Sequence, residues 1–280
     1  MKKILSLVLA IVMVATMAIS FASCGKKSDW EKIEEKGEFV CGITIYEPMN
    51  YYSDPADTST LTGFDTELAT LVAQKLGVNV KFQVIEWGNK YVELNTNVID
   101  CIWNGFTSNS KDDDGVERSE KVDFSHAYLD NKQCVVINTT KISLDSIKSA
   151  ADLAGKKATA EDGSAGATFA KSVTTVDLIS KSSQMDTFIE LNNKTVDFAV
   201  IDVLLAEKIV GNGDFKDLAI VEAINIDPEV YSIGCRKDSD FDEKINEALV
   251  ELLNEGKVEE LAAKYEVRVT DSLMALKTAK

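Results

Sequence analysis

Short apolar segments of strand character alternate with segments of helical periodicity along this chain, and the alternation runs through two consecutive blocks. In the first block, strand-like segments at 38–45, 78–85 and 98–103 are separated by helical segments at 65–76 and 87–94. This order is typical of an α/β unit with a largely parallel sheet. It constrains the fold strongly, because neighbouring parallel strands need a crossover connection, which is usually a helix.

The helix expected at 65–76 has clear start and stop signals. Its apolar residues recur at spacings of three and four, which is the period of an amphipathic helix. Asp65 is placed to act as its N-cap, and Gly77 ends it.

The second block continues the alternation. We expect strands at 133–138, 156–160, 177–179, 196–201 and 230–236, and helices at 149–153, 167–171, 184–192, 204–210, 241–253 and 258–265. Two α/β units of similar plan predict two lobes whose strand ends face a shared cleft, where ligands of open α/β sheets bind. Polar segments at 104–107 and 163–166 and the carboxylate of Asp202 take that position.

The stretch 98–129 is the first candidate for part of a binding site. A strand ends at Asn104-Gly105, small hydroxyl and amide side chains follow at 107–110, and a guanidinium follows at Arg118. These groups suit a small anion such as a carboxylate. The alternative is a surface loop after an edge strand.

The N-terminus carries an export signal. Lys2 and Lys3 precede a nearly continuous apolar segment at 4–21, and small residues lead to Cys24. The small residues favour a cleaved signal over a membrane span. Phe-Ala-Ser-Cys resembles a bacterial lipobox, which implies a signal peptide at 1–23, a lipid on Cys24 and a linker at 24–37. A secreted protein and an uncleaved anchor are the alternatives.

Charge and cysteine content narrow the class of protein. The 280 residues carry a formal net charge of −16, which argues against a nucleic-acid partner. One histidine, His126, leaves little for a metal site or a catalytic triad. An exported chain could oxidise its cysteines, but their apolar surroundings favour buried free thiols, and we expect no metal or other cofactor. The cysteines are Cys41, Cys101, Cys134 and Cys235.

Five segments in a fixed order resemble one family: TGFDTELATLVAQKLGV, VDFSHAYLDNKQ, DLAGKKATAEDGSAG, VDFAVID and YSIGCRKDSD. They are similar to the type II solute-binding proteins of ABC importers, in the polar amino-acid-binding branch (family 3). The resemblance covers about 39–267. It implies two lobes, each a mostly parallel sheet flanked by helices, joined by crossing strands near 128–132 and 228–231.

The resemblance also implies how the chain divides between the lobes. Residues 38–128 and 231–270 would form lobe 1, 129–230 would form lobe 2, and 271–280 would be a C-terminal tail.

Binding residues in the first half of the chain carry over by position. Tyr46 and Trp87 match aromatic residues that flank the ligand side chain, with core packing as the alternative. Gly105 and Thr107 match groups that meet the amino and carboxylate ends of the ligand.

Further binding residues carry over in the second half. Ser164 and Ala165 match backbone amides on the ligand carboxylate, with a simple β-turn as the alternative. Asp202 matches the carboxylate that holds the α-ammonium, with a helix N-cap as the alternative or an additional role. Glu161 lies where the family varies with the ligand side chain, so it contributes to specificity or is solvated.

The carboxylate-binding arginine of the family matches Arg118 when residues are counted back from Asp123-Phe124. Counted forward from Thr107, the register fails, because several extra residues follow it, and Lys111 becomes the competing cation. We favour Arg118, because a guanidinium offers a planar fork to a carboxylate, whereas an ammonium is a point charge.

The resemblance implies an extracytoplasmic, lipid-anchored, monomeric binding protein that delivers an amino acid to an ABC permease. Ile43 stands where several relatives carry a polar group, so a neutral or polar amino acid is expected, cystine included, although Glu161 could face a cationic side chain. One alternative is a sensory or structural lipoprotein without an importer. The other is an enzyme resembling cyclohexadienyl dehydratase, with Glu161 or His126 as its acid.

Overall fold

The structure is a computed structural model that describes residues 27–173 and 175–278. The predicted signal peptide, the lipobox and Cys24 lie outside the described residues. Within the described part of the chain, no helix combines the length and apolar character needed to cross a bilayer.

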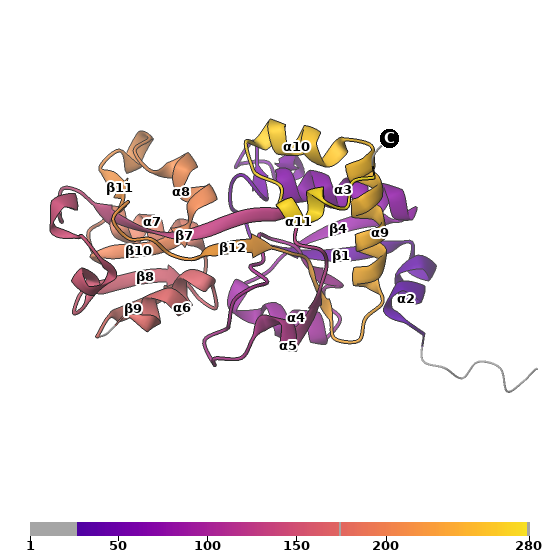
Figure 1. Cartoon of the computed structure of the whole chain (residues 1–280), viewed down its shortest axis with the longest axis horizontal. Helices are drawn as coiled ribbons and strands as arrows, with labels where there is room; N and C mark the ends of the chain where they lie inside the picture. The colour runs from indigo at the N-terminus through magenta and orange to yellow at the C-terminus, as the bar shows by residue number, and fades with distance from the viewer. Residues whose placement is uncertain (1–26, 174, 279–280) are drawn as a thin grey trace, which may run out of the picture.

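Two lobes lie side by side, each built on its own sheet (Figure 1). The first lobe has the strand order β4-β1-β5-β13-β6. Its strands are β1 (Glu38–Ile43), β4 (Asn79–Val84), β5 (Cys101–Ile102), β6 (Val122–Phe124) and β13 (Gly234–Arg236), with a hairpin of β2 (Tyr51–Tyr52) and β3 (Leu61–Thr62). Its helices are α2 (Asp29–Lys36), α3 (Phe64–Leu76), α4 (Lys90–Asn95), α5 (Arg118–Lys121), α9 (Phe241–Asn254), α10 (Lys257–Tyr265) and α11 (Asp271–Met274).

The second lobe has the strand order β11-β7-β10-β8-β9. Its strands are β7 (Leu129–Asn138), β8 (Lys157–Glu161), β9 (Asp177–Lys181), β10 (Phe198–Asp202) and β11 (Leu218–Ile220). Its α-helices are α6 (Ala165–Ser172), α7 (Gln184–Asn192) and α8 (Val203–Ile209). The two-lobed α/β fold predicted from the sequence is confirmed.

Both sheets are mixed. Strand β1 runs parallel to β4 and β5, and β8 runs parallel to β9 and β10. The antiparallel pairs involve β13 in the first lobe and β7 in the second. Strand β7 leads from the first lobe into the second, and β13 follows the return connection. Each therefore runs opposite to the strands beside it in its sheet.

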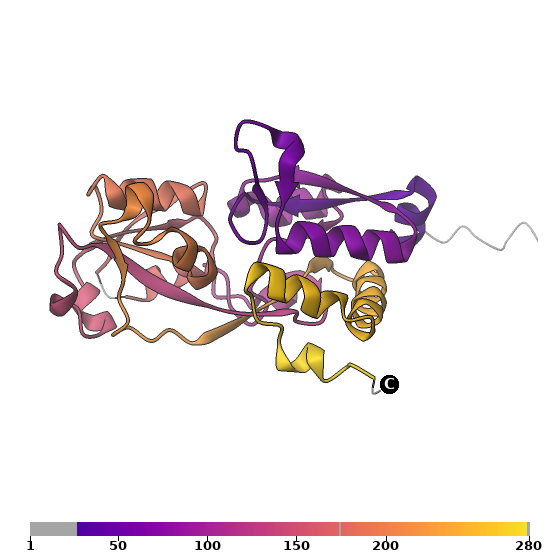
Figure 2. The ribbon, with the colours of Figure 1, turned by 90° about the horizontal axis from the view of Figure 1, so that it is seen from above.

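Two strands connect the lobes, and they pair with each other. Strand β12 (Pro228–Tyr231) runs antiparallel to the first part of β7, with Tyr231 opposite Leu129. Both strands extend from one lobe to the other (Figure 1). The C-terminal segment adds a third strand-like contact here, because the N–H of Asp130 donates to the carbonyl of Arg268 at 3.0 Å. In the view from above, this segment leads into α11, the short yellow helix at the lower edge of the picture (Figure 2).

The core of the first lobe follows from helical spacing. Phe64, Leu68 and Val72 of α3 recur every fourth residue and are fully buried. They share one cluster with Ile245 and Leu249 of α9, also four apart. Burial of each such side chain stabilises the fold by roughly 1.5–3 kcal/mol. This packing fixes α3 and α9 against the sheet of the first lobe.

The predicted N-cap of α3 is wrong. Gly63 occupies that position, with φ of 126°, and a Cβ there would lie 2.1 Å from the carbonyl oxygen of Met49. Asp65 lies inside the first turn and is 1% exposed. Its carboxylate accepts the N–H of Gly105 at 2.9 Å. Asp65 therefore holds the turn that follows β5, which is where the site begins.

Other elements differ in extent from the prediction. The strand expected at 98–103 is reduced to β5, and the segment expected at 230–236 divides into β12 and β13, with two residues between them. The expected free and buried state of the cysteines is confirmed for Cys41, Cys101, Cys134 and Cys235.

Candidate functional site

A small cavity lies between the lobes, with about 260 Å³ of empty space that includes open solvent. From the first lobe it is lined by Trp87, Asn104, Gly105, Thr107 and Arg118, and from the second by Gln133, Glu161, Ser164, Ala165, Gln184 and Asp202. Glu161 and Asp202 are the last residues of β8 and β10. The cavity is therefore at the carboxyl ends of parallel strands, as in other open α/β sheets. Of the predicted binding residues, all except Tyr46 line it.

Arg118 begins the short helix α5 and is 1% exposed. Its Nε donates to Asp112 at 3.0 Å, its Nη1 to the carbonyl of Thr107 at 3.1 Å, and its Nη2 to the carbonyl of Gly163 at 3.2 Å. The guanidinium lies over the Phe106 ring, 5.2 Å from its centroid. A guanidinium has five N–H groups, so one on each Nη is left for a ligand.

Asp202 is the most heavily bonded carboxylate of the cavity. Its Oδ1 accepts from Asn131 at 2.6 Å, from Gln133 at 2.7 Å and from the Tyr231 hydroxyl at 2.8 Å, and its Oδ2 accepts from Gln184. Burial raises the pKa of Asp202, and these four donors partly offset that effect. Since a carboxylate has about four acceptor positions, two on each oxygen, Oδ2 can take a further donor.

Glu161 is 4% exposed, and its Oε1 has no hydrogen-bond partner among the described residues. Burial, followed by repulsion from Asp202, raises its pKa to about 8, while attraction to Lys90 lowers it. This carboxylate is thus desolvated and lacks the donors that Asp202 has.

The turn after β5 presents mainly acceptors. Gly105 has φ of 55°, and a Cβ there would lie 2.1 Å from the Tyr46 hydroxyl. The N–H of Gly105 is occupied by Asp65, so its carbonyl is the group left to face a ligand. The hydroxyl of Thr107 donates to Glu229 at 3.2 Å, and burial raises the pKa of that carboxyl to about 7.

Ser164 and Ala165 form the start of α6. Ser164 is the N-cap, and its hydroxyl accepts the N–H of Ala167 at 3.0 Å. A helix N-terminus favours an anion such as a carboxylate. Gly166 lets the helix lie close to the sheet, because it has no side chain. A Cβ there would be 2.7 Å from the carbonyl oxygen of Val200.

The two predicted aromatic residues take different positions. Trp87 lines the cavity and packs edge-on against Phe106, with ring centroids 5.3 Å apart. Tyr46 is buried behind Gly105, and its hydroxyl donates to that of Tyr231 at 3.2 Å. Through Tyr231, Tyr46 is linked to Asp202.

Lys111 and Arg118 lie in different surroundings. Lys111 is exposed and forms an ion pair with Glu117 at 3.3 Å, whereas Arg118 is buried at the cavity.

Lys90 is a buried cation that the sequence did not suggest. Its Nζ donates to the carbonyl of Gly163 at 3.0 Å. Burial lowers the pKa of Lys90 to about 7, and repulsion from Arg118 adds to the effect.

Two cavity residues were missed from the sequence, Gln133 and Gln184, whereas Asn104 lies in the segment 104–107 that was expected at the cleft without being named as a binding residue. A signal existed for Gln133, because Asn131 and Gln133 are two residues apart on strand β7 and so share one face, with buried apolar residues following them. Gln184 at the start of α7 carried no signal, because polar residues are common in a first helical turn.

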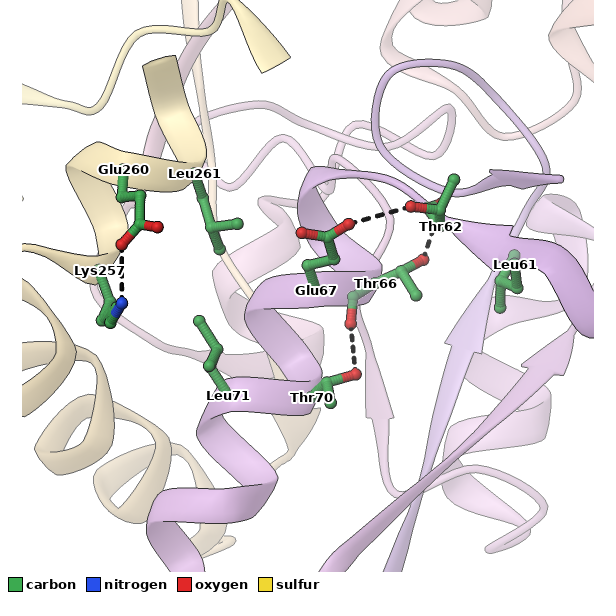
Figure 3. A pocket seen from close by; sticks show the side chains of 9 residues that line it. All are labelled: Leu61, Thr62, Thr66, Glu67, Thr70, Leu71, Lys257, Glu260 and Leu261. Atoms are coloured by element: carbon green, nitrogen blue, oxygen red, sulfur yellow. Dashed lines mark hydrogen bonds and ion pairs between the residues drawn. The ribbon is translucent and has the colours of Figure 1, made fainter. Parts of the chain in front are cut away.

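A second groove, on the outer side of the first lobe between α3 and α10, has about 750 Å³ of empty space (Figure 3). Its polar groups already have partners within the chain. The Thr62 hydroxyl donates to Glu67 at 3.0 Å, that of Thr70 to the carbonyl of Thr66 at 2.8 Å, and Lys257 pairs with Glu260 at 2.7 Å. The smaller cavity between the lobes, with opposite charges and open bonding positions, is the better candidate.

Comparison with known proteins gives a consistent result. The profile of the bacterial extracellular solute-binding proteins, family 3, matches residues 39–267. The L-cystine-binding protein TcyA of Bacillus subtilis is 27% identical over 95% of this chain and 97% of its own length. The arginine-binding extracellular protein ArtP of the same organism is 25% identical, over 95% and 98%.

A solved structure agrees. The amino acid ABC transporter substrate-binding protein AbpA of Streptococcus pneumoniae, bound to L-arginine, superposes with a TM-score of 0.72 and 25% identity. The match covers 89% of this chain and all of that one.

Proposed function

Because this chain belongs to the bacterial extracellular solute-binding proteins of family 3, we propose that it captures an amino acid between its lobes and delivers it to an ABC permease. The observation that carries the proposal is that Arg118 and Asp202, which are opposite in charge, line one cavity between the lobes. A free amino acid carries a carboxylate and an ammonium on one carbon, so it needs one counter-charge of each sign when it leaves water.

The two ends of the ligand have distinct partners in this proposal. The carboxylate accepts the two remaining Nη–H groups of Arg118 and faces the start of α6 at Ser164 and Ala165. The α-ammonium donates to Oδ2 of Asp202 and to the carbonyl of Gly105. Charge-assisted hydrogen bonds contribute roughly 1.5–3 kcal/mol each, which suffices for a micromolar complex after ordering costs.

Closure follows from where these groups lie. Arg118 belongs to the first lobe, whereas Asp202 and the start of α6 belong to the second. Only the closed arrangement brings all of them to one ligand, so binding shifts the population toward closure. The division at 38–128, 129–230 and 231–270 is part of this proposal, and the pairing of β7 with β12 at Leu129–Lys132 supports it.

The surroundings of the protein are also proposed. It is a monomer without enzymatic activity, held outside the cell membrane by a lipid on Cys24. The ligand is a polar amino acid, with cystine among the candidates, since named relatives bind cystine and arginine. A sensory lipoprotein without an importer shares the binding site and differs in its lack of uptake. The dehydratase alternative loses one of its two candidate acids, because His126 is exposed and does not line the cavity, and it keeps Glu161.

A ligand screen tests the proposal. The full chain in detergent is melted with each of the twenty amino acids and L-cystine. A ligand present at 100 times its Kd adds about 2.7 kcal/mol to stability. If no amino acid raises the melting temperature, the proposal fails; if one does, uptake of it in a deletion strain separates an importer component from a sensor.

A further inference from the structure

We infer that Glu229 is a positioning residue for amino-acid binding, which orients cavity side chains of both lobes from its place between them. This inference deepens the proposed function and rests on it. Glu229 lies on β12, one of the two strands that connect the lobes, and its side chain is buried.

Glu229 faces two amide side chains of the neighbouring strand. It lies opposite Asn131 in the register of β12 and β7, and Gln133 follows on the same face of β7. Its Oε2 accepts the side-chain N–H groups of Asn131 and Gln133, each at 3.0 Å. The same two nitrogens donate to Oδ1 of Asp202, at 2.6 and 2.7 Å. Each amide therefore directs one hydrogen to Glu229 and the other to Asp202.

This sharing fixes which end of each amide faces Asp202. A side-chain amide has donors on its nitrogen and an acceptor on its oxygen, so either end could turn toward a carboxylate. A reversed amide would place its oxygen against the oxygens of both Asp202 and Glu229. The Oδ1 of Asn131 is buried without a hydrogen-bond partner among the described residues, so the contacts of its nitrogen determine its orientation. Oδ1 of Asp202 thus keeps its donors, and Oδ2 stays available for the ligand ammonium.

Glu229 also holds a residue of the first lobe. The same Oε2 accepts the hydroxyl of Thr107 at 3.2 Å, and Thr107 lines the cavity. Asp202 lines the cavity from the second lobe. One oxygen on a connecting strand thus orients groups that meet the ligand from opposite sides.

The orientation depends on an acceptor rather than on a charge. Burial, followed by repulsion from Asp202, raises the pKa of Glu229 to about 7, while donation from Gln133 and attraction to Arg118 lower it. Both the carboxylate and the acid can accept at Oε2, because the acid can carry its proton on Oε1. Glutamine offers the same acceptor with its carbonyl oxygen.

Three substitutions of Glu229 test the inference. Glu229→Gln keeps the acceptor, Glu229→Asp keeps the charge but withdraws the acceptor by one methylene, and Glu229→Met keeps the length without a strong acceptor. Calorimetry on the full chain in detergent uses whichever of L-cystine and the twenty amino acids raises the melting temperature of the native chain most. We expect Glu229→Gln to bind it within about threefold of the native chain, and the other two variants roughly tenfold more weakly.

Lys132→Met is the matched control. Lys132 lies between Asn131 and Gln133 on β7 but is exposed on the opposite face, so its replacement should leave the affinity unchanged. Thermal melting without ligand checks that each variant folds, and Glu229→Asp carries the test if Glu229→Met does not fold.

The order of the affinities decides the outcome. If Glu229→Asp binds as tightly as the native chain, or if Glu229→Gln loses as much affinity as Glu229→Asp, the inference is wrong while the proposed function stands. If no amino acid binds the native chain, both fail.

Discussion

At the scale of single residues, Arg118 and Lys111 are the two cations between which the sequence could not decide. Lys111 is exposed and engaged with Glu117, whereas Arg118 is buried against the cavity with two N–H groups free. We expect Arg118→Ala to weaken ligand binding about 100-fold or more, because two charge-assisted bonds are lost. Lys111→Ala should stay within about twofold, since exposed pairs contribute little.

Calorimetry on the two variants and the native chain measures this difference. Arg118→Lys keeps the charge but loses the planar fork, so an intermediate affinity is expected. Thermal melting without ligand checks that each variant folds, because Arg118 also holds the carbonyls of Thr107 and Gly163. Wild-type affinity in a folded Arg118→Ala chain would refute its role.

The raised pKa of Glu161 predicts how the stability of the ligand-free chain depends on pH. Its pKa is raised from an ordinary value of 4.5 to about 8, so the folded chain holds a proton that the unfolded chain releases between these values. Stability from this group is complete below about pH 4.5 and is lost as the pH rises to about 8. Asp202, Lys90, Asp162 and Asp186 are the charged groups that act on it.

Glu161→Gln should therefore flatten the pH profile. At pH 8 we expect the variant to be more stable than the native chain by about 1–3 kcal/mol, because opening of the lobes relieves part of the burial cost. At pH 5 the two should be nearly equal. Urea unfolding from pH 4.5 to 8 measures the difference, and a constant offset at all pH values would contradict the assigned cause.

At the scale of elements, the segment 111–115 contacts the other lobe. Asp113 accepts from Thr168 at 3.2 Å and pairs with Lys171 at 2.5 Å, both on α6. These are the extra residues that disturbed the register of the family resemblance, and the structure brings one of them, Asp113, into contact with the second lobe. The contact is partly exposed, so its contribution is modest.

Loss of this contact should favour the open form. We expect Asp113→Asn to weaken ligand binding by about two- to fivefold, as for an exposed ion pair of up to about 1 kcal/mol. Asp114→Asn is the matched control, because Asp114 pairs with Lys121 inside the first lobe. Calorimetry compares the two, and equal effects would show that the bridge to α6 has no part in closure.

Elements were predicted well where the local pattern is strong. The helix at 184–192 was predicted with its observed bounds, and in the structure the Ser183 side chain caps its start. The strand at 98–103 was predicted too long, since Ile99 and Trp103 are buried apolar residues that lie on either side of the ladder, which includes only Cys101 and Ile102. Aspartate is a common N-cap residue, but the carboxylate of Asp65 accepts the N–H of Gly105, and no local pattern reveals that contact.

The residues of the cavity were predicted only in part, again because some of their contacts leave no local pattern in the sequence. Residues at strand ends, such as Asp202, follow from topology and from the family resemblance. Lys90 meets Gly163 of the other lobe and Gln184 meets Asp202 of a later strand, and the sequence neighbourhoods of both residues resemble ordinary helix starts. Contacts between residues far apart in the chain therefore account for most of what the sequence did not reveal.

At the scale of the whole molecule, ligand exchange requires the lobes to separate. The cavity is closed on one side by the first lobe and on the other by the second, and two neighbouring strands, β7 and β12, connect them. Direct contacts join the lobes in this arrangement, such as those from Lys90 and Arg118 to the carbonyl of Gly163. A covalent link across the cleft should therefore trap this closed arrangement.

Gly88 of the first lobe and Asp162 of the second offer such a link. A Cβ at Gly88 would lie 3.7 Å from the Cβ of Asp162, within the range of about 3.5–4.5 Å found in disulfides. Its only close approach, 2.5 Å to a carboxylate oxygen of Asp162, disappears when that side chain becomes cysteine. We expect oxidised Gly88→Cys/Asp162→Cys to be compact in solution scattering with or without ligand, and to bind ligand at least about 100-fold more slowly, since exchange needs opening.

Reduction of the link should restore the native association rate. The single variants Gly88→Cys and Asp162→Cys control for side-chain loss and for reactions of other thiols, and the cysteines of the lobes are buried. Stopped-flow binding before and after reduction measures the effect in one sample. A disulfide that forms and yet leaves ligand association unchanged would mean that the ligand enters without separation of the lobes, and the role assigned to closure would then be wrong.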